Sequence, residues 1–293
     1  MLDIIRYSFG VGIRHWRIAA IVYFCQLCLA LTLGLEVHNV LKSSIGNSLE
    51  INKLLNAYDH TVITDFLKVH GASITPLIGQ LRWLLLAWLL FSVFLDAGLI
   101  YCVNAPDRNH GQAFFYGGAK YYFSFLKISL FCIVLALLWT ALLWIPFGLA
   151  FEPMLTTFTS EAYAVWLALL LLGVYLLGLA FLFVWSVLSR FHRINTDSTM
   201  WQCLGYARRS IWRYKALILG LLGLFALAQI ILVYLYSRLE HSIVPHSAFL
   251  LLLLFLLQQV FVFVRIQVRQ MMYAGINRTR IYDHTNDHQP LAI

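Results

Sequence analysis

An aspartate inside an apolar stretch is the residue whose type and position point most directly to chemistry. Asp96 is preceded by WLLFSVFL and followed by AGLIYCV. A carboxylate within a membrane-spanning helix is energetically costly. It therefore usually pairs with another polar group and suggests a functional site. Three uses of Asp96 stay open. It could form a proton- or substrate-responsive site, it could accept hydrogen bonds in a structural clasp, or it could simply reach the membrane interface.

A polar stripe near the end of the chain offers partners for this carboxylate. Gln258, Arg265 and Arg269 are seven and four residues apart, which places them on one face of a helix. Counted from the starts of their spans, Asp96 and Arg265 reach similar depths, so an ion pair between them is geometrically possible. In a structural clasp the donor to Asp96 would be Arg265 or Arg190. Asp96, Gln258, Arg265 and Arg269 together form the predicted intramembrane polar site.

Other side chains with chemical potential do not form a recognisable active site. Cys25 and Cys28 form a CxxC inside an apolar run, where a thiolate is disfavoured, so we interpret them as small apolar side chains. The histidines expected outside the membrane lack a helical ligand spacing such as HExxH. The sequence contains no GxxxxGK[ST] and no GxSxG. We therefore predict no catalytic residue, no metal and no cofactor.

The composition identifies the environment in which these residues act. Of the 293 residues, 61% are hydrophobic and 12% are charged. A soluble domain is roughly 45–50% apolar, so the apolar surface of this chain must face lipid. The formal net charge of +8 comes from residues that flank the apolar runs, a placement that membrane topology explains without nucleic acid.

Six apolar runs are long enough to cross a bilayer as helices, since a span needs about 20 residues. We predict an all-α, polytopic membrane protein in which residues 1–293 form a single membrane domain. The predicted spans are about 18–35, 81–103, 127–150, 163–189, 216–237 and 247–266.

A basic connector, residues 181–215, orients these spans. Basic residues concentrate in loops that stay on the cytoplasmic side, so we expect this connector and both termini to be cytoplasmic. Five of the 21 lysines and arginines then lie outside and the other sixteen inside. The residues that we expect at the membrane interface or against a partner are Arg190, Arg193, Arg208, Arg209, Trp212, Arg213 and Lys215.

Segments around Trp16, Phe125 and Trp212 each place an aromatic residue among basic ones just before a span. This pattern predicts three amphipathic elbow helices at the inner interface. The outer loop, residues 36–80, has helical periodicity over Ser48 to Tyr58 and over Thr61 to Val69, ending at Gly71. Two short helices are expected there, either as a packing cap or as a lid over a transport path.

Three segments support a resemblance to known proteins: FLDAGLI (Phe94 to Ile100), FFYGGAKYYFSFLK (Phe114 to Lys127) and QQVFVFVRIQVR (Gln258 to Arg269). In the order of these three segments, the chain resembles a group of uncharacterised six-helix bacterial inner-membrane proteins. That group is distantly similar to the membrane domain of some glycerophosphodiester phosphodiesterases. Asp96 stands where the pattern has a small residue, and Ser124 where it has a basic one. The resemblance implies the bacterial inner membrane, and it implies no phosphodiesterase activity.

Three functions follow as hypotheses. The first is a non-enzymatic membrane subunit or scaffold of an envelope or transport assembly, whose partners are the lipid bilayer and a membrane protein or further copies of the chain. The second is a transporter or lipid-handling permease with a polar site near Asp96. The third, an intramembrane enzyme, would depend on Asp96, His60 and His70.

Overall fold

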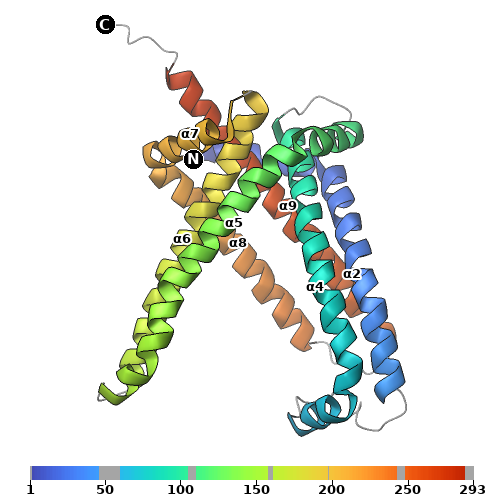
Figure 1. The fold of residues 1–293 in the computed structure, drawn as a ribbon. Helices are drawn as coiled ribbons and strands as arrows, with labels where there is room; N and C mark the ends of the chain where they lie inside the picture. Colours follow the sequence, from blue (N-terminus) through green and yellow to red (C-terminus); the bar gives the residue numbers. More distant parts are fainter. Residues whose placement is uncertain are drawn as a thin grey trace, which may run out of the picture. The chain divides into compact units, whose positions relative to one another are not determined.

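A computed structural model describes residues 2–45, 60–104, 110–157, 161–196, 198–242 and 248–287. Over these residues the chain is all-helical, with eight helices and no strand (Figure 1). The helices are α1 (Leu2–Arg14), α2 (Trp16–Ile45), α4 (His60–Asn104), α5 (His110–Thr157), α6 (Glu161–Asn195), α7 (Met200–Arg213), α8 (Lys215–Ser242) and α9 (Ala248–Asp287).

The prediction of six membrane-spanning helices is confirmed at the level of length and composition. Six of the described helices are long and apolar enough to cross a bilayer, and each predicted span overlaps a different one of them. The longest apolar segment, Gly111–Phe151, has 41 residues. At 1.5 Å per residue it is about 60 Å long, against a hydrocarbon core of about 30 Å. Part of α5 must therefore extend beyond the lipid.

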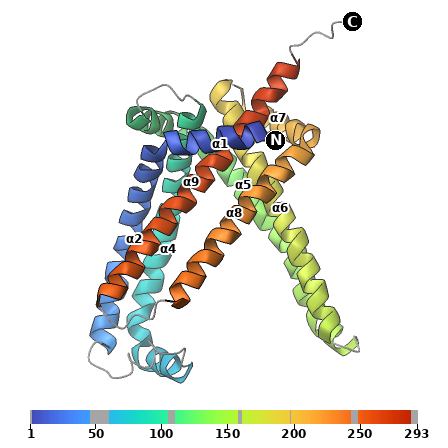
Figure 2. The same cartoon turned by 180° about the vertical axis from the view of Figure 1, so that it is seen from behind.

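The chain divides into two compact units. The smaller unit, Ala20–Ser92, holds most of α2 and the first part of α4, and these two helices run side by side in both views (Figures 1 and 2). The larger unit contains Met1–Ala19 and Val93–Ile293. The expectation of one membrane domain over the whole chain stays a prediction.

Within the larger unit the helices pack in pairs. The long helices α5 and α6 form a hairpin, α1 crosses α9, α7 packs on the end of α6, and α8 packs on α9 (Figure 2). Small residues permit the α1–α9 crossing, because a Cβ at Gly275 would lie 2.9 Å from the Oγ of Ser8.

Buried side chains of the larger unit concentrate in particular parts of its helices. They come from the last turns of α4 and α6, the first turns of α5 and α8, the short helices α1 and α7, and the second half of α9. The largest are Phe114, Phe125, Phe191, Leu221 and Tyr273. By contrast, the middle of α6 is almost entirely exposed, for example Leu170 at 63% and Leu177 at 66%. Exposed leucines along a span are what a lipid-facing surface requires.

Several expected boundaries are wrong. Residues 114–127 were expected as a separate elbow helix, but they form the first part of α5, which continues into the span. The segment Thr61 to Val69 does not end at Gly71, because α4 runs without a break from His60 to Asn104. The other expected outer helix, Ser48 to Tyr58, lies outside the described residues.

The short helices α1 and α7 are separate elements, since each ends just before a long helix begins. The start of α7 is fixed by two hydrogen bonds. The backbone N–H of Thr199 donates to Oε1 of Gln202 at 2.9 Å, and Nη1 of Arg193 donates to the carbonyl of Ser198 at 2.7 Å. Satisfying such terminal groups stabilises a helix start. The location of α1 and α7 in the membrane interface stays a prediction.

Candidate functional site

Asp96 lies near the end of α4 and is bonded by two arginines from different helices. Its Oδ2 accepts a hydrogen bond from Nη1 of Arg190 on α6 at 3.0 Å. Its Oδ1 accepts a hydrogen bond from Nη2 of Arg269 on α9. The Asp96 and Arg190 side chains are 14% and 10% exposed, so this ion pair is largely removed from water, whereas the Arg269 side chain is 36% exposed. We call Asp96, Arg190 and Arg269 the clasp.

Arg190 extends the clasp to a fourth helix. Its Nη2 donates to Oγ of Ser129 on α5 at 2.9 Å, and its guanidinium carbon lies 5.6 Å from the centroid of the Phe125 ring. Arg190 is 8% exposed. A buried guanidinium needs a counter-charge and hydrogen bonds. Both Nη atoms of Arg190 have them, while its buried Nε has no hydrogen-bond partner among the described residues. One carboxylate and one arginine therefore connect α4, α5, α6 and α9.

Arg269 is held from its own helix as well. Its Nε donates to the hydroxyl of Tyr273 at 3.1 Å, one turn further along α9. The Tyr273 ring in turn stacks on Phe183 of α6, with the ring centroids 6.2 Å apart. Arg269 is thereby oriented by Tyr273, an aromatic residue buried between α6 and α9.

The end of α4 and the start of α5, which lie beside the clasp, pack closely at two glycines. A Cβ at Gly98 would lie 2.6 Å from the carbonyl oxygen of Phe114, and one at Gly118 would lie 2.8 Å from the ring of Phe94. Phe94 and Phe114 pack edge to face, with centroids 6.4 Å apart. The end of α4 and the start of α5 can approach this closely only because side chains are missing there. This contact places Asp96 against α5.

Of the two donors considered for Asp96, Arg190 bonds to it and Arg265 does not. Arg265 is exposed and lies over the ring of Phe261, 5.8 Å from its centroid, while Arg269, one turn further along α9, bonds to Asp96. Gln258 is also exposed. The predicted polar stripe thus divides into one residue that bonds within the protein, Arg269, and two that are exposed, Gln258 and Arg265.

The predicted interface residues also divide. Arg190 was expected at the interface or as a donor to Asp96, and it is buried and bonded to Asp96. Arg193 is half-buried and holds the start of α7. The remaining five are exposed: Arg208, Arg209, Trp212, Arg213 and Lys215.

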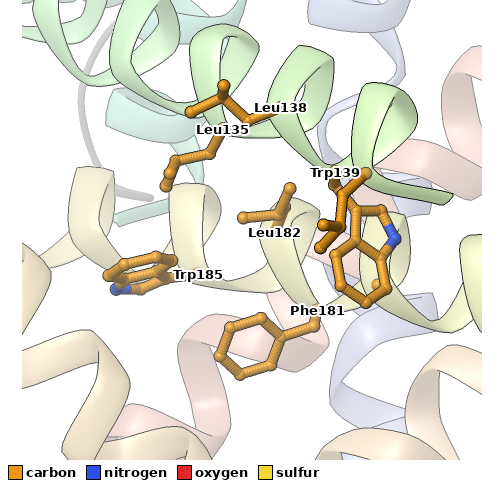
Figure 3. Close-up of a pocket in the computed structure, with 8 residues that line it drawn as sticks. Leu135, Leu138, Trp139, Phe181, Leu182 and Trp185 are labelled. Atoms are coloured by element: carbon orange, nitrogen blue, oxygen red, sulfur yellow. The ribbon is translucent and has the colours of Figure 1, made fainter. Parts of the chain in front are cut away.

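Sequence inspection missed an apolar groove between α5 and α6 (Figure 3). Its volume is about 540 Å³, and its lining includes Leu135, Leu138 and Trp139 of α5 opposite Phe181, Leu182 and Trp185 of α6. A side chain at Gly178 would collide with the Trp139 indole, whose N–H donates to the carbonyl of Tyr175 at 3.4 Å. The signal that the sequence offered for this groove was one glycine, Gly178, and two tryptophans, Trp139 and Trp185, within apolar spans.

Among the described residues, no three His, Cys, Asp or Glu side chains are grouped so that they could hold a metal ion. Comparisons with protein-family models, with curated proteins and with solved structures give no match to this chain.

Proposed function

We propose that this chain is a non-enzymatic integral membrane subunit or scaffold that works with other proteins of an envelope or transport assembly. One observation carries the proposal. Both carboxylate oxygens of Asp96 are already bonded to arginines, so the ionisable residue most expected to handle a substrate instead joins α4 to α6 and α9. A group bound in this way supports architecture more directly than transport.

The proposed setting is the bacterial inner membrane, with both ends of the chain cytoplasmic. The excess of basic residues on the predicted inner side supports this orientation. The proposed partner is a membrane protein or a second copy of the chain. The surface offered to it is the outer part of the α9 stripe, Gln258 and Arg265, together with the exposed tryptophan and arginines of α7.

The test is extraction of the chain from its native membrane in a mild detergent, followed by mass spectrometry of every protein that stays with it. We expect one protein partner in fixed stoichiometry, or a defined oligomer of the chain. A chain that purifies only as a monomer without any partner would contradict the proposal.

A matched pair of variants locates the contact. Arg265→Gln removes an exposed arginine on α9 that lies over the aromatic ring four residues before it, and we expect it to reduce partner recovery. Arg238→Gln on α8 removes an exposed arginine in the same relation to Tyr234, and should leave recovery unchanged. Equal recovery with both variants would exclude the α9 stripe as the contact.

The groove between α5 and α6 favours a second candidate, a lipid-handling permease, because its apolar lining suits a hydrocarbon chain. Reconstitution in vesicles that carry a fluorescent phospholipid in one leaflet distinguishes the two. A permease would speed exchange between leaflets, whereas a scaffold would leave the rate at that of protein-free vesicles.

A further inference from the structure

The groove of α5 and α6 has an aromatic end. Trp185, which lines the groove, contacts Phe131 of α5 with centroids 6.1 Å apart, and Phe131 contacts Trp201 of α7 at 5.5 Å. The Trp185 indole N–H donates to the carbonyl of Leu204 at 2.8 Å, which joins this cluster to α7. Tryptophans with one polar and one apolar side are typical of the headgroup level of a bilayer.

The length of the groove matches one leaflet. From Phe131 at the aromatic end to Leu142 in the lining, α5 advances eleven residues, which is about 16 Å of helix. Half of a hydrocarbon core is about 15 Å. If the aromatic cluster lies at headgroup level, Leu142 lies near the middle of the bilayer. The groove then follows the path of an acyl chain.

Positive charge lies at the aromatic end. Lys127 is exposed and stands one helical turn before Phe131, on the α5 face that continues through Leu135 and Leu138 into the groove. Arg208 is exposed on α7, seven residues after Trp201 and therefore on the same face of that helix. Cations at headgroup level attract anionic lipids. An apolar groove with cations at one end has the polarity of a phospholipid with an anionic headgroup.

The lining suits a lipid chain better than a partner helix. Close helix packing in membranes uses small residues that let two backbones approach. In this lining the small residue is Gly178, and the Trp139 side chain already covers it. The other lining positions carry leucine, phenylalanine or tryptophan. A volume of about 540 Å³ is within the range of roughly 300–1,000 Å³ that small-molecule sites occupy.

We propose that the groove between α5 and α6 is a binding site for one anionic phospholipid. An acyl chain lies along Leu135, Leu138 and Leu182, and the phosphate is bound at Lys127 and Arg208. The site is independent of the proposed scaffold function, because a scaffold and a permease could equally hold a resident lipid.

The acyl-chain part is tested by native mass spectrometry of the full chain in micelles that contain equal amounts of phosphatidylglycerol and phosphatidylcholine. Leu138→Trp fills the groove and should remove the retained lipid. Leu137→Trp is the matched control, because Leu137 is 64% exposed against 61% for Leu138 but does not line the groove. Equal lipid retention by the two variants would overturn the proposal.

The headgroup part is tested in the same micelles. Wild type should retain one phosphatidylglycerol in preference to phosphatidylcholine. Lys127→Gln and Arg208→Gln should each lower that preference about fivefold, while Lys215→Gln, at an exposed position outside this face, should not. Retention of both lipids in equal amounts would mean ordinary boundary lipid and would overturn the proposal. So would cross-linking of a protein helix to Leu138→Cys in native membranes.

Discussion

The contact of α4 with α6 and α9 depends on the single carboxylate of Asp96. Asp96→Asn keeps the size of the side chain but leaves the buried Arg190 and the half-buried Arg269 without a counter-charge. Breaking a buried ion pair by removing one partner costs about 3–5 kcal/mol. Because the Arg269 side chain is 36% exposed, we expect the lower end of that range. The measurement is the unfolding free energy in detergent, with Arg265→Gln as the surface control.

The clasp should also behave as a coupled unit. In a double-mutant cycle of Asp96→Asn and Arg269→Gln, the second change should cost much less once the first is present, because the guanidinium has already lost its partner. We expect a coupling energy of about 1–3 kcal/mol. Additive effects would show that the ion pair contributes nothing, even though the two side chains are bonded in the structure.

At the scale of helices, close contact between α4 and α5 depends on a glycine. Gly98→Ala would place a methyl group 2.6 Å from the carbonyl oxygen of Phe114, so the backbone must shift. Such overpacking typically costs about 1–3 kcal/mol. Gly173→Ala in α6 is the control, because a Cβ there meets nothing within 4 Å and alanine is the better helix former. The thermal midpoint should fall for the first variant and stay level or rise for the second.

The comparison of sequence with structure is clearest in these helices. Hydropathy predicted all six spans, because a long apolar run in lipid has few alternatives to a helix. Of the two donors considered for Asp96, Arg190 is bonded to it. On α9 the donor is Arg269, one turn after Arg265, because depth along a span does not determine which face of a helix turns toward its neighbour. Gly98 was visible as a small residue, but its contact with Phe114 depends on how two helices cross. The groove likewise depends on how α5 and α6 pack against each other.

At the scale of the larger unit, the packed and the lipid-facing parts are separate. Buried side chains and the clasp lie toward the ends of α4, α6 and α9 and around α7, whereas the middle of α6 is exposed. Between helices in lipid there is no hydrophobic driving force, because lipid tails are as apolar as leucine. Polar cross-links and small residues must supply what holds such helices together. This explains why Asp96, on α4, accepts hydrogen bonds from arginines of α6 and α9.

At the scale of the whole molecule, the orientation of the chain in the membrane is the prediction that the positive-inside rule makes. We expect α7 on the cytoplasmic side and the end of α8 outside. His241→Cys and Arg209→Cys put one thiol at each of these exposed positions. In intact cells a membrane-impermeant maleimide should label His241→Cys, and it should label Arg209→Cys only after permeabilisation. The wild-type chain is the background control, because Cys203 is buried and the other four cysteines lie inside candidate spans. The reverse pattern would place α7 and its arginines outside. The positive-inside argument would then fail, and with it the proposed cytoplasmic location of Lys127, Arg208 and the lipid headgroup that they are proposed to bind.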